Sequence, residues 1–539
     1  MKYQLLSLFT ILFPLISSAQ EKGLDEQIND AFMPFAIWWE GFVLTPIPIA
    51  GYNIPVVLIL LVFGATFFTF YFKFPNILKF PLAINTVRGK YDEIEGPEGH
   101  GVEKAEVNIV EGDLPDTIRD ESKEGEVSHF QALATAVSGT VGLGNIAGVA
   151  VAIAVGGPGA TFWMIVCGLV GMSTKFVECT LGVKYRDVGA DGTVYGGPMY
   201  YLSRGLKEKG YKRLGQALGI IFAVLCVGAS FGGGNAFQSN QAAVQLSTML
   251  NLEGGATGVI IGIILAILVG IVIIGGIKKI ASVTEKIVPF MAVIYVLASL
   301  VIIFANFEFI GDAFGMIVSG AFTPLAGLGG ILGVIIVGFQ RAAFSNEAGA
   351  GSAAIAHSAV KTKYPASEGV VALLEPFIDT VVICTMTALV IIFFNMDAGA
   401  FDYGNSVNST VMLNETGSYI GGVDLTSMAY DSVIPGFRYV LTIAIILFAF
   451  STMISWSYYG LQSWKFLFGR GKTADTLYKV LFLLFVVIGA AATLDAVIKF
   501  SDAMILALVF PNMIGLLFLF PRVKEELAKY MSAIKSVSK

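Results

Sequence analysis

The chain has 539 residues, of which 55% are apolar and only 14% charged, with a formal net charge of −6 and a mean hydropathy of +0.75. Soluble proteins carry about 25% charged residues, so this composition excludes an ordinary soluble domain. Charge-free stretches long enough to cross a bilayer core of ~30 Å recur along the chain, beginning at residues 53–72. We therefore predict an all-α, multi-spanning membrane protein whose partner is the lipid bilayer, and we expect no nucleic-acid partner.

The N-terminus has the three-part pattern of a secretory signal: a basic start, an apolar run, and then the small residues Ser17 and Ala19. We predict a signal peptide over residues 1–19, with an uncleaved helix as the alternative. Residues 20–128 then hold an external segment, the first transmembrane helix and an acidic cytoplasmic insertion at 91–126.

The apolar stretches predict eleven spans. They lie near residues 53–72, 130–155, 160–183, 214–246, 258–276, 284–306, 331–357, 368–395, 435–462, 477–494 and 503–520. Two of the loops between them, 307–330 and 396–434, contain no Lys or Arg, whereas the loops on the opposite side collect basic residues. The positive-inside rule then predicts an external N-terminus and a basic cytoplasmic tail at 521–539, in a bacterial inner membrane.

Two spans are interrupted by glycines beside hydrogen-bonding residues. The first interruption is SGTVGLGNIAG at 138–148 in the second span, and the second is FSNEAGAG at 344–351 in the seventh. Glycine costs about 1 kcal/mol in a helix interior, and backbone unwound at membrane depth is tolerated only beside a cavity or inside protein. We interpret both segments as helix breaks that line a binding site. Close helix packing through small residues is the alternative.

The two interruptions also match each other. Asn145, Ala147 and Gly148 align with Asn346, Ala348 and Gly349 at one constant offset, and Ala152 aligns with Ala353. The segments begin spans that lie five apart, so they cross the membrane in opposite directions. Two inverted five-helix units, each opening with a broken helix, are typical of transporters. We predict these units at 129–307 and 308–520.

These motifs carry a resemblance to a known family. The run VGLGN at 141–145 is similar to the broken first core helix of the bacterial leucine transporter and its sodium symporter relatives. The wider pattern SGTVGLGNIAGVA with SNEAGAGSAAIAH, and Asn235-x-x-Gln238-x-Asn240, resemble the alanine or glycine:cation symporter family. The resemblance implies a leucine-transporter-like 5+5 inverted repeat with one extra N-terminal helix. It also implies cation-coupled uptake of a small neutral amino acid such as alanine or glycine.

The first break predicts two binding functions. Free N–H groups at a half-helix N-terminus suit a substrate carboxylate. Those groups belong to Gly142, Leu143, Gly144 and Asn145. The carbonyls of Ser138 and Val141, on the other side of the break, are candidate ligands for a cation.

The ninth span supplies further candidates through the resemblance. It places the hydroxyls of Ser451 and Thr452 opposite the first break, at a shared sodium site, and it places Trp456 at the border of the substrate pocket. A tryptophan there would restrict the ligand to a very small side chain. Without the resemblance, hydroxyls that bond back to their own helix are the alternative. A tryptophan taken alone would be expected to lie at the membrane interface or to pack against neighbours.

Other polar residues inside the spans complete the candidate site. Asn235 and Gln238 lie one turn apart, and we expect both amides to face the cavity or a neighbouring helix. The remaining substrate-binding candidates are Thr140, Phe344 and Asn346. The intramembrane charges are assigned to structure and gating: Lys175 with Glu178 as an i,i+3 pair, and Arg341 with Glu347 flanking the second break.

We expect alternating access with Na⁺ as the coupling ion, because no single carboxylate is obviously placed in the ligand set; H⁺ is the alternative ion. An ion channel would need filter motifs repeated by oligomeric symmetry, and the internal repeat argues against that class. An intramembrane enzyme would need paired catalytic groups, and the three histidines are scattered along the chain. We therefore predict a transporter that is not an enzyme, with no oligomeric state indicated.

Overall fold

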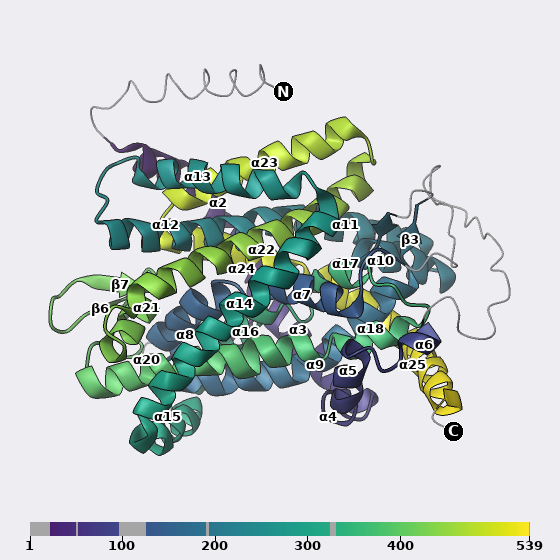
Figure 1. The fold of residues 1–539 in the computed structure, drawn as a ribbon, viewed down its shortest axis with the longest axis horizontal. Coiled ribbons are helices and arrows are strands. Elements are labelled where there is room, and N and C mark those ends of the chain that lie inside the picture. Colours follow the sequence, from purple (N-terminus) through teal and green to yellow (C-terminus); the bar gives the residue numbers. More distant parts are fainter. Residues whose placement is uncertain (1–21, 50–51, 96–124, 190–192, 324–329, 538–539) are drawn as a thin grey trace.

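The computed structural model describes residues 22–49, 52–95, 125–189, 193–323 and 330–537, and helices dominate these ranges (Figure 1). Within them, seven helices are long and apolar enough to cross a membrane, and a bent pair over residues 129–156 makes an eighth. Three shorter apolar helices coincide with the remaining predicted spans. The prediction of an all-helical, multi-spanning membrane protein is confirmed. The signal peptide, and the acidic insertion over 96–124, lie outside the described residues.

The outer faces of two helices show which surface meets lipid. In α13 (Thr257–Ile273) and α14 (Gly276–Ala305), the inward residues are buried while large apolar side chains on the other face are exposed. The exposed residues are Ile260, Ile264, Ile267, Ile271, Phe290, Val293, Leu297 and Val301. Such a continuous apolar surface is costly in water but not in hydrocarbon. Because every backbone group of a helix bonds within the helix, these segments are stable in lipid.

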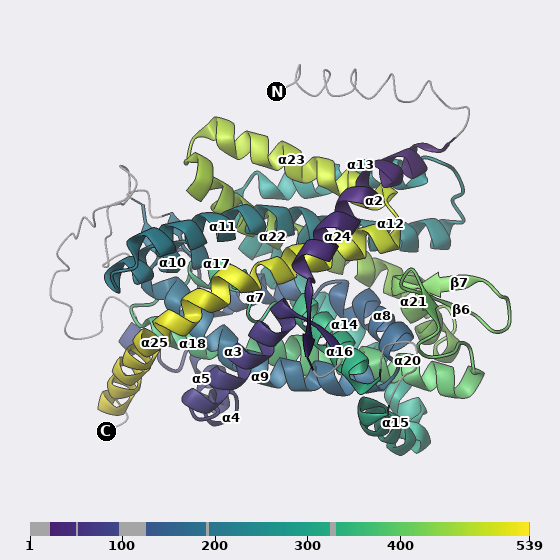
Figure 2. The ribbon, with the colours of Figure 1, turned by 180° about the vertical axis from the view of Figure 1, so that it is seen from behind.

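A helix outside the predicted spans covers the back of the bundle (Figure 2). This helix, α2 (Leu24–Val43), packs against α24 (Leu494–Ala507). The Asp25 carboxylate accepts hydrogen bonds from the N–H groups of Gly258 and Val259 at 2.9 and 3.1 Å, so it caps the start of α13. The acidic residues of α2 interrupt its apolar pattern, which is why no span was predicted here.

A short hairpin and the first span follow α2. The hairpin pairs β1 (Pro46–Ile49) with β2 (Tyr52–Pro55). The first span, α3 (Val56–Tyr71), then packs against α9 (Gly159–Lys184). Three short helices lead to the acidic insertion: α4 (Pro75–Leu78), α5 (Phe80–Val87) and α6 (Asp92–Glu95).

The first five-span unit begins with a broken helix. It consists of α7 (His129–Thr140), the π-helical turn η1 (Gly144–Gly148) and α8 (Val149–Gly156), with a bend of 50° between the halves. The unit continues with α9 (Gly159–Lys184), then α11 (Lys212–Phe231), η2 (Gly232–Ala236) and α12 (Phe237–Leu250) as one long span, and finally α13 and α14.

The second unit repeats this plan. Its broken helix is α16 (Ile331–Asn346) with α17 (Ala353–His357), followed by a span built from α18 (Pro365–Val371), α19 (Leu374–Pro376), η5 (Phe377–Cys384) and α20 (Thr385–Ala398). Then come α22 (Phe437–Phe468), α23 (Lys472–Ala491), and α24 with α25 (Val509–Val537). The helix α25 continues through Pro521 into the segment predicted as the basic tail.

The two broken helices run antiparallel. The first half of the first broken helix, α7, packs against the second half of the other, α17, and α8 packs against α16. The second break has a left-handed backbone at Glu347 (φ 55°), Gly349 (φ 96°) and Gly351 (φ 83°). Glycine adopts such angles readily, and the two glycines allow the chain to leave one helix and start another within a few residues.

The connecting elements gather at the two ends of the bundle (Figure 1). One end carries α15 (Ile310–Phe322), the sheet of β5 (Ser406–Val407), β6 (Thr410–Met412) and β7 (Tyr419–Gly421), and α21 (Gly422–Val433). The opposite end carries α6, β3 (Asp187–Val188), β4 (Val194–Tyr195), α10 (Pro198–Glu208) and the C-terminus. The loops free of Lys and Arg thus share one end, as the charge pattern predicts.

Candidate functional site

The first break presents two backbone N–H groups to side-chain amides. The N–H of Leu143 donates to Oε1 of Gln238 at 3.0 Å. The N–H of Gly142 is shared between Oδ1 of Asn145 at 3.0 Å and the carbonyl of Thr140 at 2.9 Å, and the N–H of Asn145 donates to the carbonyl of Gly142 at 3.2 Å. Two amide oxygens therefore accept from the groups predicted to hold a substrate carboxylate. An ionised carboxylate is a stronger acceptor at such donors than a neutral amide. All the predicted site residues are buried.

The cation side of the break meets α22. The Thr452 hydroxyl donates to the carbonyl of Ser138 at 2.9 Å, and the Ser138 hydroxyl donates to the carbonyl of Ser451 at 2.8 Å. Val141 ends α7 with ψ at 85°, which turns its carbonyl away from the helical direction. The Ser451 hydroxyl bonds to the carbonyl of Phe448 at 3.0 Å, within its own helix. Ser138 and Thr452 are thus in direct contact, whereas the side chain of Ser451 has a local partner.

A buried carboxylate lies beside the first break. Asp379, in η5, accepts hydrogen bonds from Asn145 Nδ2 at 2.8 Å through Oδ2 and from Ser345 Oγ at 2.7 Å through Oδ1. Thr380 donates to the same Oδ1 at 2.7 Å, and Asn346 Nδ2 donates to the Thr380 hydroxyl at 2.9 Å. The sequence did not place a carboxylate in the ligand set, and the structure places that of Asp379 beside Asn145 of the first break. Asp379 is one of several acids in its apolar span, and the sequence did not identify its partners.

Small residues let an aromatic side chain approach the break. A Cβ added to Gly144 would lie 3.3 Å from two ring carbons of Phe344, and one added to Gly233 would lie 3.1 Å from a third. Phe344 also meets Phe237 edge to face, with centroids 5.2 Å apart. The Thr140 hydroxyl instead donates weakly to its own helix, at 3.3 and 3.4 Å. Gly144 and Phe344 therefore share one wall of the site.

The two amides of the fourth span have different neighbours. Gln238 turns to the first break, while Asn235 Nδ2 donates to the carbonyl of Phe482 in α23 at 2.6 Å. Asn235 belongs to the π-helical turn η2, whose wider winding changes the direction of side chains relative to an α-helix. The structure therefore brings Gln238 to the break and directs Asn235 to a neighbouring helix.

Trp456 connects α22 to the second break. Its indole N–H donates to Oε1 of Glu347 at 3.0 Å, and a Cβ added to Gly234 would lie 2.1 Å from its Cγ. The ring is 1% exposed, so it is enclosed between η2 and the second break. Trp456 lies one turn from Thr452, whose hydroxyl contacts the first break.

The other intramembrane charges have partners that the sequence did not predict. Lys175 pairs with Glu375 at 3.0 Å and not with Glu178, so the predicted i,i+3 pair is wrong. Glu178 accepts instead from the N–H of Gly349 at 2.9 Å and from Asn512 at 2.7 Å. In the same way, Arg341 forms an ion pair with Asp502, a residue of α24.

An antiparallel pair of broken helices enclosing buried, hydrogen-bonding groups defines a membrane transporter of the inverted-repeat class. Residues 109–539 match the model of the sodium:alanine symporter family. The chain belongs to this family, and it is therefore a transporter and not an enzyme.

Several related transporters align with most of the chain. The sodium/alanine symporter AgcS of Methanococcus maripaludis is 42% identical over 78% of this chain and 88% of that protein. The sodium/proton-dependent alanine carrier protein of Bacillus sp. (strain PS3) is 33% identical over 77% of this chain and 90% of that protein. The probable sodium/glutamine symporter GlnT of Bacillus subtilis is 32% identical, over 76% and 79%. Among solved structures, MhsT in complex with L-phenylalanine aligns with a TM-score of 0.48 and 16% identity, over 74% of this chain and 99% of that chain.

Proposed function

We propose that this protein couples the movement of Na⁺ to the uptake of small neutral amino acids, alanine and glycine first, by alternating access. The observation that carries the proposal is the contact between Ser138 and Thr452 beside the N–H groups of the first break. It joins a candidate cation position to a candidate carboxylate position across two helices. Membership of the sodium:alanine symporter family supports both.

The cation position offers hard oxygen ligands. The Ser138 carbonyl and the Thr452 hydroxyl are 2.9 Å apart, so an ion that binds both must separate them slightly. The Val141 carbonyl and the Ser451 hydroxyl complete the proposed set, and Ser451 would have to give up its hydrogen bond to the Phe448 carbonyl to take part. Asp379, with Asn145 and Ser345, supplies a second group of oxygens nearby. Because a carboxylate also binds protons, H⁺ is the alternative coupling ion.

The substrate position fits an amino acid held by its carboxylate. The N–H groups of Gly142 and Leu143 would bind the carboxylate in place of the amide oxygens that accept from them here. Phe344 and Trp456 enclose the space near the two breaks, and their bulk favours a small side chain. A larger amide substrate is the competing proposal, because one relative carries the name of a glutamine symporter.

The proposed orientation places the end with α6, α10 and the C-terminus in the cytoplasm of a bacterial cell. The basic residues of that end support it through the positive-inside rule. A cysteine introduced within 396–434 should react with an impermeant reagent from outside, and one within 100–125 only after permeabilisation. The reverse pattern would invert the topology.

Uptake of labelled alanine, glycine and glutamine into proteoliposomes, with and without an inward Na⁺ gradient, tests the function directly. We expect Na⁺-driven accumulation of alanine and glycine and little of glutamine. Accumulation of glutamine in preference to alanine would overturn the substrate proposal. Accumulation of alanine driven equally well by a proton gradient without Na⁺ would overturn the assignment of Na⁺ as the coupling ion.

A further inference from the structure

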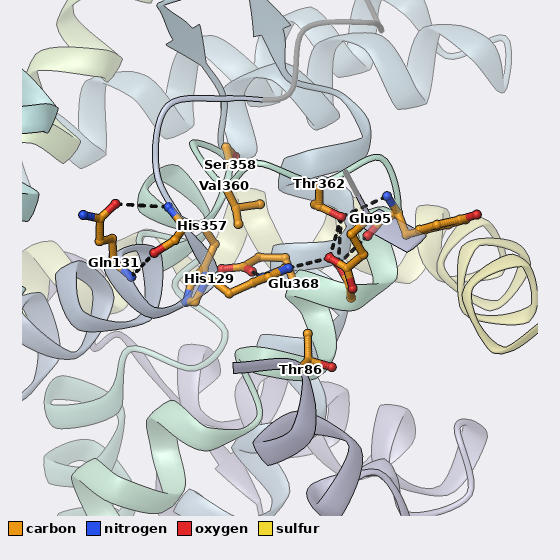
Figure 3. A network of polar contacts seen from close by, with 12 residues as sticks. Thr86, Glu95, His129, Gln131, His357, Ser358, Val360, Thr362 and Glu368 are labelled. Carbon is orange, nitrogen blue, oxygen red and sulfur yellow. Dashed lines mark hydrogen bonds and ion pairs between the residues drawn. The ribbon is translucent and has the colours of Figure 1, made fainter. Parts of the chain in front are cut away.

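A chain of buried acids, histidines and one lysine lies at the end of the bundle proposed to face the cytoplasm. Figure 3 shows the part of it around the two histidines. Its members come from six different helices and are at most 7% exposed. They are Glu95 of α6, His129 of α7, Lys175 of α9, His357 of α17, Glu368 of α18 and Glu375 of α19. The transport site described above uses none of them.

His129 lies between two carboxylates. Its Nδ1 contacts Oε2 of Glu368, and its Nε2 lies 2.5 Å from Oε2 of Glu95. Glu95 also accepts from the hydroxyls of Tyr530 at 2.8 Å and Thr362 at 3.0 Å. Figure 3 shows His129 between these two acids, with Thr362 beside Glu95.

His357 repeats the arrangement further into the membrane. Its Nδ1 lies 2.5 Å from Oε1 of Glu368, and its Nε2 lies 3.4 Å from Oε2 of Glu375 as an ion-pair contact. Lys175 then meets the other oxygen of Glu375 at 3.0 Å. Glu368 thus joins the two histidines, which are far apart in the sequence.

This geometry requires bound protons. A neutral imidazole has one N–H donor and an ionised carboxylate has none, so a histidine with a carboxylate at each nitrogen needs one additional proton. His129 has this surrounding. His357 has a carboxylate within hydrogen-bond distance at Nδ1 only, and its Nε2 lies at ion-pair distance from Glu375. Two protonated histidines with Lys175 balance the three acids. Without those protons the buried cluster would hold a net charge of −2, which is costly away from water.

Positively charged neighbours do not neutralise the acids in place of these protons. The titratable and charged groups that act on the cluster from the helices packed against it are Glu178, Cys179, Arg186, Glu347, Asp379, Tyr459 and Tyr530. Of these, only Arg186 is positive. Its guanidinium donates to the carbonyls of Ser358 at 2.8 Å and Thr362 at 3.0 Å rather than to an acid of the cluster.

The cluster also holds α7, the first half of the first broken helix, in place. His129 is the first residue of α7, and the other end of α7 carries Ser138 of the proposed cation position. An opening at this end that moves α7 away from α6 and α18 must break both contacts of His129. Once exposed to water, the imidazole returns toward its ordinary protonation.

We propose that this cluster is a proton-binding latch, loaded with two protons when α7 is packed as described and releasing protons to the cytoplasm when this end opens. The inference rests on the proposed alternating access. It makes opening, and hence uptake, depend on the internal pH. High internal pH favours release, and low internal pH keeps the latch closed.

The test measures Na⁺-driven alanine uptake into proteoliposomes whose internal pH is set between about 6 and about 9, around the ordinary range of histidine, at fixed external pH. Uptake should rise with internal pH, by up to about tenfold per pH unit for each proton released in the limiting step. His129→Gln should flatten this profile, and His357→Gln should make it shallower.

A matched control is Gln131→Ala. Gln131 also lies at the start of α7, where it caps the helix and donates to Glu285 at 2.8 Å, but it does not titrate. This variant should change the rate of uptake and keep the wild-type dependence on pH. A wild-type profile without a slope, or a His129→Gln profile as steep as the wild type, would overturn the latch.

A second measurement does not need transport. Hydrogen exchange of the 129–140 segment in the wild-type protein, corrected for the intrinsic dependence of exchange on pH, should show more opening as pH rises. Opening that does not change with pH would overturn the latch even if the variants fail to fold. Absence of alanine uptake at every pH would instead count against the proposed function, and exchange would still decide the latch.

Discussion

Gly142→Ala tests whether the contact between the first break and α22 is the cation position. A Cβ at residue 142 would lie 2.4 Å from the Thr452 hydroxyl oxygen, 3.3 Å from the Thr452 Cβ and 3.1 Å from Oε1 of Gln238. Rotating Thr452 does not remove the close approach, because its Cβ lies 3.3 Å from the added Cβ in every rotamer. Either α22 moves away or the bond from Thr452 to Ser138 is lost.

The expected magnitude follows from overpacking. Inserting one methyl group into a filled interior costs about 1–3 kcal/mol, which corresponds to a roughly 5- to 150-fold change in an equilibrium constant. The cost applies to the packed, ion-binding state, so the Na⁺ concentration for half-maximal alanine uptake should rise by that factor. The assay is labelled alanine uptake into proteoliposomes across a series of Na⁺ concentrations.

Gly148→Ala is the control within the same span, because a Cβ there would meet nothing within 4 Å. It adds the same methyl group but leaves the contact intact, so we expect wild-type Na⁺ dependence. A folded Gly142→Ala protein with unchanged Na⁺ dependence would refute the assignment. Equal losses in both variants would point to a general need for flexible glycines.

Three further predictions concern single side chains. Thr452→Ala should raise the Na⁺ concentration for half-maximal uptake, since losing one ligand costs on the order of 1–3 kcal/mol; unchanged dependence would remove Thr452 from the site. Trp456→Ala should admit larger neutral amino acids and weaken alanine competition, because one methylene in a filled pocket is worth about 1–3 kcal/mol; equal weakening of all substrates would show a purely structural tryptophan. Burial raises the pKa of Asp424 in α21 to about 6, so the folded state binds this proton more tightly than the unfolded state. Thermal stability in detergent should therefore fall as pH rises from about 4 to about 6, and Asp424→Asn should remove that fall; a variant with the wild-type pH profile would contradict it.

The spans and the two breaks were predictable because their causes are local. A bilayer imposes a length and an apolar composition on each crossing segment, and these can be read from consecutive residues. The helices at 159–184 and 365–398 correspond closely to predicted spans for this reason. The glycines around Asn145 and Asn346 likewise mark interruptions within their own segments. The helix α2 was missed because it mixes acidic and apolar residues.

Only the tertiary structure decided which polar groups meet. Asp379 bonds to Asn145, and Lys175 pairs with Glu375 instead of Glu178, which is nearer in the sequence. The packing of separate spans selects these partners regardless of their distance in the sequence. A π-helical turn sends Asn235 away from the break that Gln238 reaches.

The hydrophobic pattern along the chain does not show which polar groups of different spans meet. His129 and His357 looked scattered in the sequence, yet both contact Glu368, since the antiparallel broken helices bring α7 and α17 together. The sequence by itself determined the class of protein and the positions of its breaks. The contacts between helices determined which residues form the positions proposed for a cation, an amino acid and protons.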